Sequence, residues 1–453
     1  MSRRARSAAL VAVLLLSGSL AGADDWPQWR GPQRDGVWRE EGLAATLPDE
    51  GLDYAWRTPV NLGYAGPAVA EGKVYLFEYE RTDGEITDQP GARDKLKGIE
   101  RVRCLDATSG DEVWRHEYER DYDISYPGGP RCTPTVDGDH VYTLGPEGDL
   151  RCLRTSDGTV VWSKFFPDDY QAPTPLWGHS AHPLVDGDTL YCLVGGDGSV
   201  VVAFNKLTGE DKWRALSTPS MKNEVGYCPP MMIEHNGAKQ LVVFDPEATC
   251  GLDPATGETL WSVPILSSYG MSIAQPLPMG DRLFVTGYGG PSVFFQLPAK
   301  GAEPKILWSG EAKTSASAAN ASPIADADGR VIYAVDANSS SLVAIDPANG
   351  ERHWESQLPT RGKAERRSRA RHGTVFVIRQ GESDRYWLTS ETGDLILARL
   401  TPEAYEEIAR QPLLEPTGNA FGRPVLWSHP AFAERSVFAR NDKEIVRVNL
   451  AAE

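Results

Sequence analysis

Residues 252–261 read LDPATGETLW, and the same phrase recurs as LDATSGDEVW at 105–114, LRTSDGTVVW at 153–162, FNKLTGEDKW at 204–213 and IDPANGERHW at 345–354. In every copy, Gly follows the leading apolar residue by five positions and Trp follows it by nine. The Asp, Pro, Thr and Gly residues are typical of a tight turn with a left-handed position at Gly. Each phrase therefore predicts a β-hairpin that ends in tryptophan.

Two looser copies extend the series, one ending at Trp308 and one near Glu406, with a period of about 46 to 51 residues. Two more strands precede each phrase, for example within 132–144 and 145–153. A proline opens the first strand of most repeats, where its missing N–H does little harm: Pro67, Pro134, Pro183, Pro229, Pro276, Pro323 and Pro430. Four antiparallel strands at this period predict a propeller blade, and radial closure removes exposed sheet edges.

The number of blades follows from the two ends of the chain. Seven hairpin phrases account for seven blades, while residues 429–450 supply only three further strands. The segment LDYAWRTPV at 52–60 supplies the missing outer strand. We therefore expect an all-β, eight-bladed propeller over residues 52–453, closed by pairing of an N-terminal strand with the C-terminal blade and preceded by an extension at 24–51.

The repeated tryptophans are predicted to be structural anchors of the blades, with each ring stacked between blades and each indole N–H bonded to a backbone carbonyl. They are Trp56, Trp114, Trp162, Trp213, Trp261, Trp308 and Trp354.

With these phrases the chain resembles the pyrroloquinoline-quinone (PQQ) repeat superfamily, whose blades share the pattern D-x-x-T-G-x-x-x-W. The resemblance covers nearly all of residues 52–450. The opening DDWPQWRGPQRDGVWREEGL at 24–43 also resembles the W-P-x-W-R-G-P start of secreted members. The superfamily includes quinone-dependent dehydrogenases and non-enzymatic BamB-like outer-membrane assembly factors, so the resemblance implies the fold without deciding the activity.

Two departures from those relatives guide the choice. Quinoprotein alcohol dehydrogenases carry a disulfide between adjacent cysteines and acidic calcium ligands, and this sequence has no adjacent cysteines. BamB-like factors fit better in architecture, although many of them are lipoproteins and this chain lacks the lipobox cysteine.

The N-terminus has the pattern of a secretory signal peptide over residues 1–23: three arginines, an apolar stretch at 8–16 and small residues at 21–23. No later stretch is long and apolar enough to predict a transmembrane segment. We therefore expect an exported protein, periplasmic or secreted. The formal net charge of −17 disfavours nucleic acid as a partner.

Cysteine usage leaves the redox chemistry open. Six cysteines in an exported chain allow disulfides whose pairing the sequence does not give: Cys104, Cys132, Cys152, Cys192, Cys228 and Cys250. None forms a C-x-x-C motif, which removes the usual zinc-ribbon pattern and covalent haem attachment.

Loops that enter the first strand of each blade converge on the central channel of a propeller, where we expect a ligand or partner to bind. Hydration of the channel mouth by the same polar residues is the alternative. The candidates are Arg131, Trp177, His179, His182, Glu224, Tyr227, Asn320, Arg371, His372, Arg423 and His429. We assign none of them as catalytic or as a metal ligand, because no catalytic motif is present and no acidic partner accompanies His179 and His182.

Three functions remain open. The first is a monomeric, non-catalytic binding or assembly scaffold without a cofactor, which engages other cell-envelope proteins through the channel mouth or by strand addition at blade edges. The second is a dehydrogenase that uses PQQ with calcium, and the third is a polysaccharide hydrolase or lyase. The roles of an insertion at 79–100 and of a basic run at 361–372 stay open as well.

Overall fold

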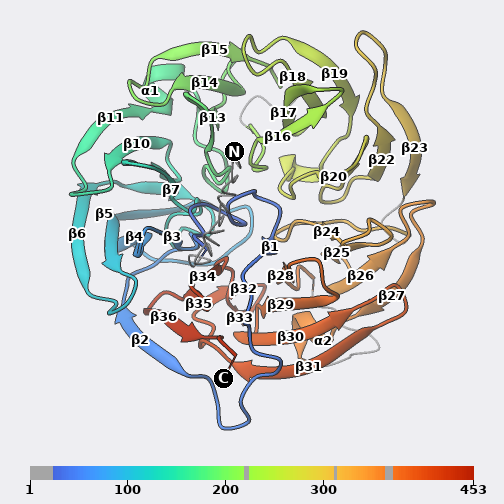
Figure 1. Cartoon of the computed structure of the whole chain (residues 1–453). Helices are drawn as coiled ribbons and strands as arrows, with labels where there is room; N and C mark the ends of the chain where they lie inside the picture. The colour runs from blue at the N-terminus through green and yellow to red at the C-terminus, as the bar shows by residue number, and fades with distance from the viewer. Residues whose placement is uncertain (1–23, 219–223, 311–313, 363–370, 453) are drawn as a thin grey trace, which may run out of the picture.

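The computed structural model describes residues 24–218, 224–310, 314–362 and 371–452. The predicted signal peptide and most of the basic run therefore lie outside the described residues. The described part forms eight four-stranded antiparallel blades around a central axis (Figure 1), which confirms the predicted fold class.

Each of seven blades is built from four consecutive strands, which follow one another from the channel to the rim. The first blade consists of β3 (Ala68–Ala70), β4 (Lys73–Asp83), β5 (Asp94–Asp106) and β6 (Glu112–Glu119), and the second of β8 (Thr135–Asp137), β9 (His140–Leu144), β10 (Asp149–Arg154) and β11 (Val160–Phe165). The third consists of β12 (Leu184–Asp186), β13 (Thr189–Leu193), β14 (Val201–Asn205) and β15 (Asp211–Ala215), and the fourth of β16 (Met231–His235), β17 (Ala238–Phe244), β18 (Ala248–Leu252) and β19 (Thr259–Pro264). The fifth blade consists of β20 (Leu277–Met279), β21 (Arg282–Val285), β22 (Ser292–Gln296) and β23 (Lys305–Gly310), and the sixth of β24 (Ile324–Ala325), β25 (Ile332–Asp336), β26 (Ser341–Ile345) and β27 (Arg352–Ser356). The seventh consists of β28 (Val375–Gln380), β29 (Arg385–Ser390), β30 (Asp394–Leu400) and β31 (Tyr405–Pro412).

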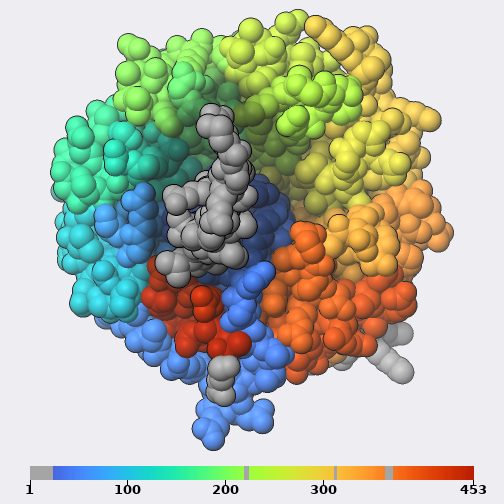
Figure 2. Space-filling model, in the orientation of Figure 1, coloured from blue at the N-terminus to red at the C-terminus, as the bar shows by residue number. Residues whose placement is uncertain are grey.

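The eighth blade joins the two ends of the chain, as expected. Its inner strands are β34 (Ala431–Ala433), β35 (Ser436–Arg440) and β36 (Glu444–Asn449), and its outer strand is β2 (Tyr54–Pro59), which pairs with β36. Figure 2 shows the blue N-terminal and red C-terminal segments adjoining at this blade.

The remaining elements are short. They are β1 (Val37–Trp38), β7 (Tyr122–Ile124), the hairpin β32 (Gly418–Ala420) and β33 (Arg423–Val425), the helices α1 (Phe166–Tyr170) and α2 (Leu358–Arg361), and a 3₁₀ turn at Ser268–Gly270. No described helix is long and apolar enough to cross a membrane.

The insertion at 79–100 lengthens the hairpin of β4 and β5 beyond the other blades, and β7 pairs with its return strand. All six cysteines are free and buried. The disulfides that the sequence allowed are therefore not formed in this structure.

The repeated tryptophans hold neighbouring blades together. Six of the seven indole N–H groups donate to a backbone carbonyl of the next blade over 2.8 to 3.0 Å: Trp56 to Ala107, Trp114 to Thr155, Trp162 to Lys206, Trp213 to Pro254, Trp308 to Pro347 and Trp354 to Thr401. The Gly of the next phrase lies under the ring: a β-carbon on Gly209 would be 2.7 Å from Trp162. The Trp of one phrase and the Gly of the next phrase thus form a contact between neighbouring blades.

Trp261 is the exception, and the prediction of a backbone partner was wrong for it. Its N–H donates instead to the Gln240 side chain of its own blade at 2.8 Å. The next hairpin, β22 to β23, has the longer turn. A β-carbon added to Gly301 of that turn would have no heavy atom within 4 Å, so this glycine does not receive the Trp261 ring. The ring lies instead against Gly251 of its own blade.

Candidate binding site at the channel mouth

The loops that lead into the first strands surround a cavity of about 510 Å³ at one end of the channel. Seven of the eleven sequence-predicted residues line it: Arg131, Trp177, His182, Tyr227, Asn320, His372 and His429. The blades thus bring together residues that are up to about 300 positions apart in sequence.

Aromatic side chains form most of the cavity wall. Besides the three histidines, the lining includes Trp29, Tyr64, Tyr126, Trp177, Tyr227, Tyr269, Tyr288, Phe421 and Trp427. Sequence reasoning found only Trp177 and Tyr227 of these nine. The W-P-x-W-R-G-P opening was the available signal for Trp29, which the N-terminal segment carries into the channel.

Four of the aromatic wall residues have left-handed backbone conformations. Tyr126, Tyr269, His372 and Phe421 have φ between 50° and 61°. A bulky side chain in this region costs about 1–2 kcal/mol, and such strain is concentrated at functional sites. Tyr269 is also 73% exposed, so burial of its ring does not offset the strain.

The floor of the cavity is a cluster of three rings. Trp29 stacks on His182 with ring centroids 4.8 Å apart, and His429 meets both rings edge-on. Burial lowers the pKa of His429 to about 3 and that of His182 well below its ordinary value, so both imidazoles are neutral.

Backbone contacts fix the tautomer of His182. The N–H of Thr133 donates to His182 Nδ1 at 2.9 Å, which places the imidazole proton on Nε2. The indole N–H of Trp29, in a residue 4% exposed, has no hydrogen-bond partner among the described residues. The floor therefore contains a buried N–H group without a partner among the described residues.

Arg131 supplies the positive charge at the wall. Its guanidinium donates to the carbonyls of Gly129, Ser125 and Tyr126 and lies over the ring of Tyr64. Desolvation by burial lowers the pKa of Arg131. The backbone carbonyls and the Tyr64 ring therefore compensate the buried charge.

The other four candidates lie beside or behind the wall. His179 is buried edge-on against Phe166. Glu224 accepts a hydrogen bond of 2.5 Å from the Tyr227 hydroxyl. Arg423 pairs with Glu391 at 2.9 Å and donates to the Arg371 carbonyl at 3.0 Å. These contacts support the wall without lining it.

The described wall of the cavity has no acidic side chains. Within the described ranges, no Asp, Glu, Lys or Cys side chain lines the cavity, and no group of three His, Cys, Asp or Glu residues could hold a metal ion. Calcium requires several oxygen ligands, usually carboxylates. The residues present thus do not fit a calcium-bound quinone, and a glycosidase would need two carboxylates at the scissile bond.

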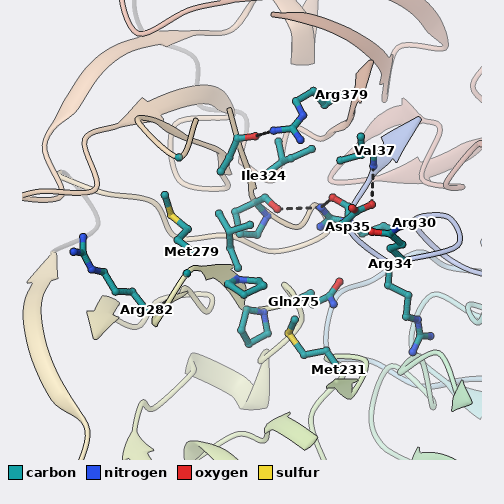
Figure 3. Close-up of a pocket in the computed structure, with 18 of the residues that line it drawn as sticks. Arg30, Arg34, Asp35, Val37, Met231, Gln275, Met279, Arg282, Ile324 and Arg379 are labelled. Carbon is teal, nitrogen blue, oxygen red and sulfur yellow. Dashed lines mark hydrogen bonds between the residues drawn. The ribbon is translucent and has the colours of Figure 1, made fainter. Parts of the chain in front are cut away.

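A second cavity of about 790 Å³ lies along the channel, between the N-terminal segment and the first strands β12, β16, β20 and β24 (Figure 3). Met231, Met279 and Ile324 line it together with Arg30 and Arg34 of the N-terminal segment. The sequence prediction did not include this cavity, because it treated the extension at 24–51 apart from the channel.

The comparisons with known proteins agree with the fold. The sequence profile of the family described as outer membrane protein assembly factor BamB matches residues 99–295 and 251–452. No curated protein matches the sequence significantly.

Two solved structures show the same architecture. BamB from Moraxella catarrhalis is 12% identical, with a TM-score of 0.53, and the match covers 87% of this chain and 97% of that one. Quinohemoprotein alcohol dehydrogenase from Comamonas testosteroni is 11% identical, with a TM-score of 0.60, and the match covers 95% and 81% of the two chains. At these identities the likeness shows the fold alone.

Proposed function

The chain belongs to the family of outer membrane protein assembly factor BamB, and on this premise we propose that it is an exported, non-catalytic scaffold that binds other proteins of the cell envelope. The partner engages the channel-mouth cavity. Export is supported by the signal-peptide pattern at 1–23 and by the outer-membrane role named for the family.

The composition of the cavity wall carries this proposal. Nine Trp, Tyr and Phe side chains and Arg131 surround the cavity. Trp, Tyr and Arg are the residue types that dominate binding energy at protein interfaces, where they cluster in desolvated pockets. The strained backbone at Tyr269 and Phe421 presents two of these rings at the exposed rim, 73% and 44% exposed.

The same wall argues against the two enzyme functions. A general acid or base must reach the reacting atoms, and two carboxylates that accept hydrogen bonds from wall residues do not themselves line the cavity. Glu224 is held by Tyr227, and Glu391 is paired with Arg423. This arrangement suits binding better than proton transfer.

Site-specific photocrosslinking in intact cells tests the proposal. A photoreactive phenylalanine analogue in place of Trp427 should give covalent adducts with specific envelope proteins, identified by mass spectrometry. The same analogue in place of Val113, which is 51% exposed on the rim strand β6, is the matched control. Equal adducts at both positions, or none at the mouth, would contradict the scaffold.

A titration separates the scaffold from a dehydrogenase. Purified protein is mixed with PQQ and calcium while tryptophan fluorescence and reduction of an artificial electron acceptor are followed with alcohols and sugars. We expect neither saturable binding nor turnover. Turnover would replace the scaffold by a quinone-dependent dehydrogenase.

A further inference from the structure

The N-terminal segment binds inside the channel by pairing with the inner edges of blades. Trp26 exchanges both of its backbone hydrogen bonds with Val69 of β3, and the Pro27 carbonyl accepts from Val136 of β8. Farther along, β1 pairs in parallel with β28. The centre of Figure 1 shows this segment, in blue, crossing the ring. Inner edges of this propeller therefore accept an extended peptide.

Five inner edges are not used in this way. In the described part of the chain, β12, β16, β20, β24 and β34 each end their sheet and have a strand neighbour on the rim side only. The first four of these strands line the second cavity. Val185 of β12 lies opposite Leu190, as Val69 lies opposite Val74, so its N–H and C=O face the channel as those of Val69 do.

The side chains of this cavity leave no charge for a peptide to neutralise. Met231, Leu277, Met279 and Ile324 give it an adaptable apolar side. Its aspartates pair with basic side chains of the protein: Asp35 with Arg39, Asp186 with Lys239, and Asp326 and Asp328 with Arg330. The side-chain carbonyl of Gln275, in a residue 5% exposed, has no hydrogen-bond partner among the described residues. An N–H group of a bound peptide would satisfy it.

The four arginines of the cavity do not require an anion, because groups of the protein already contact them. Arg379 donates to the carbonyls of Gly381 and Ala325, and Arg282 lies 3.6 Å from Asp281. Arg34 donates to the carbonyls of Pro230, His182 and Pro183, and Arg30 donates to those of Asp35 and Pro323. Figure 3 shows the Arg30 bond at the wall of the cavity.

We propose that the second cavity is a peptide-binding groove, in which an extended, apolar and uncharged segment of a partner adds to the inner edges of β12 and β16 as the N-terminal segment adds to β3 and β8. Backbone hydrogen bonds hold the segment, and alternate side chains enter the Met231 and Met279 side of the groove. This groove does not depend on the proposed function of the channel mouth.

Binding of capped eight-residue peptides to the whole protein tests the groove. The probes alternate threonine with valine, leucine or phenylalanine, and each has a twin that is N-methylated at every second residue. We expect saturable binding of at least one probe and slower amide hydrogen exchange at 184–186 and 231–235. Because one hydrogen bond contributes about 0.5–1.5 kcal/mol, each lost N–H should weaken binding roughly 2- to 12-fold. Equal binding of the N-methylated twins, or no binding of any probe, would overturn the groove.

A proline variant tests the same edge from the protein side. Val185→Pro removes the channel-facing N–H, and the corresponding Pro278 of β20 shows that the fold accepts proline there. We expect at least a threefold loss of peptide affinity, on the order of the loss of one hydrogen bond. The control Trp427→Ala, at the mouth, should leave that affinity unchanged, and Val185→Pro should leave crosslinking at the mouth unchanged. If Val185→Pro does not fold, the N-methylated peptides on the unaltered protein still decide.

Discussion

At the residue scale, strained aromatic residues distinguish the channel mouth from the rest of the molecule. Among the described residues, every aromatic residue with a left-handed backbone lines the mouth cavity: Tyr126, Tyr269, His372 and Phe421. A turn that only connected two blades would be more stable with Gly or Asn at such a position. Tyr126 and His372 pack against the Phe421 ring, so the exposed rings of Tyr269 and Phe421 are the ones that we expect a partner to contact.

Replacing one of these residues by glycine separates binding from stability. In Tyr269→Gly, relief of about 1–2 kcal/mol of strain opposes about 0.5–1 kcal/mol of added chain entropy, so the free energy of unfolding should stay equal or rise by up to about 1.5 kcal/mol. Partner crosslinking at the mouth should fall. Thermal unfolding and crosslinking yield measure the two effects, and a clear loss of stability would mean that the ring supports the fold.

Glu100 makes stability depend on pH. Burial, followed by the charge of Asp149, raises the pKa of Glu100 from 4.5 to about 8, while Tyr118 and Tyr122 donate hydrogen bonds to its carboxyl group. The folded protein thus keeps a proton that the unfolded chain releases above its ordinary pKa. The stability contributed by this proton is present at low pH and is lost as pH rises to the folded pKa.

The variant Glu100→Gln should remove this pH dependence. As pH rises from about 5 to about 8, the parent protein loses stability and the variant does not. We therefore expect the free energy of unfolding of the variant to increase relative to that of the parent over this range. Urea unfolding across that range measures the difference. Parallel pH profiles for the two proteins would show that Glu100 keeps an ordinary pKa.

At the scale of elements, the ten-residue phrase predicted the blades because its two fixed residues, Gly and Trp, both take part in the contact between neighbouring blades. Gly209 needs its left-handed φ of 72° for the turn and its missing β-carbon for the Trp162 ring of the preceding blade. Two independent constraints on one position keep the pattern recognisable. The exception at Trp261 was not predicted, because Gly251 and Gln240, which receive its ring and its N–H, lie outside the ten-residue phrase.

A pair of glycine variants measures this contact. Gly209→Ala should lower the free energy of unfolding by about 2–4 kcal/mol, from backbone strain and from overlap with Trp162. In Gly187→Ala the φ of 60° gives similar strain, but no heavy atom lies within 4 Å of the added carbon, so the loss should be only the strain of about 1–2 kcal/mol. Equal losses in urea unfolding would mean that the contact between blades contributes nothing.

The candidate site was predicted only in part, again for physical reasons. Residues that flank the predicted first strands, such as His182 and His429, could be assigned to the mouth because topology alone places those loops there. Phe421 and Trp427 belong to the extra hairpin region around β32 and β33, which has no equivalent in the other described blades. Trp29 arrives from a segment that threads the channel, and no repeat pattern signals such a path.

At the scale of the whole molecule, the two ends of the chain close the ring. Strand β2 covers the rim edge of β36, and Trp56 of β2 donates to the Ala107 carbonyl of the first complete blade. One strand therefore joins the last blade to the first. Without it, β36 would present an unpaired edge, which is a template for pairing with another chain.

Two truncations of the mature chain test this closure. A chain starting at residue 52 keeps β2 but loses the channel segment, whereas a chain starting at residue 61 also loses β2. We expect the first to remain a monomer with a lower melting temperature, because the contacts of Trp26, Arg30 and Arg34 are lost. We expect the second to associate through β36, because hydrogen bonds of an exposed strand edge are satisfied by a second copy. Light scattering after size exclusion distinguishes the two, and monomeric behaviour of both would show that the inner three strands close the ring without β2.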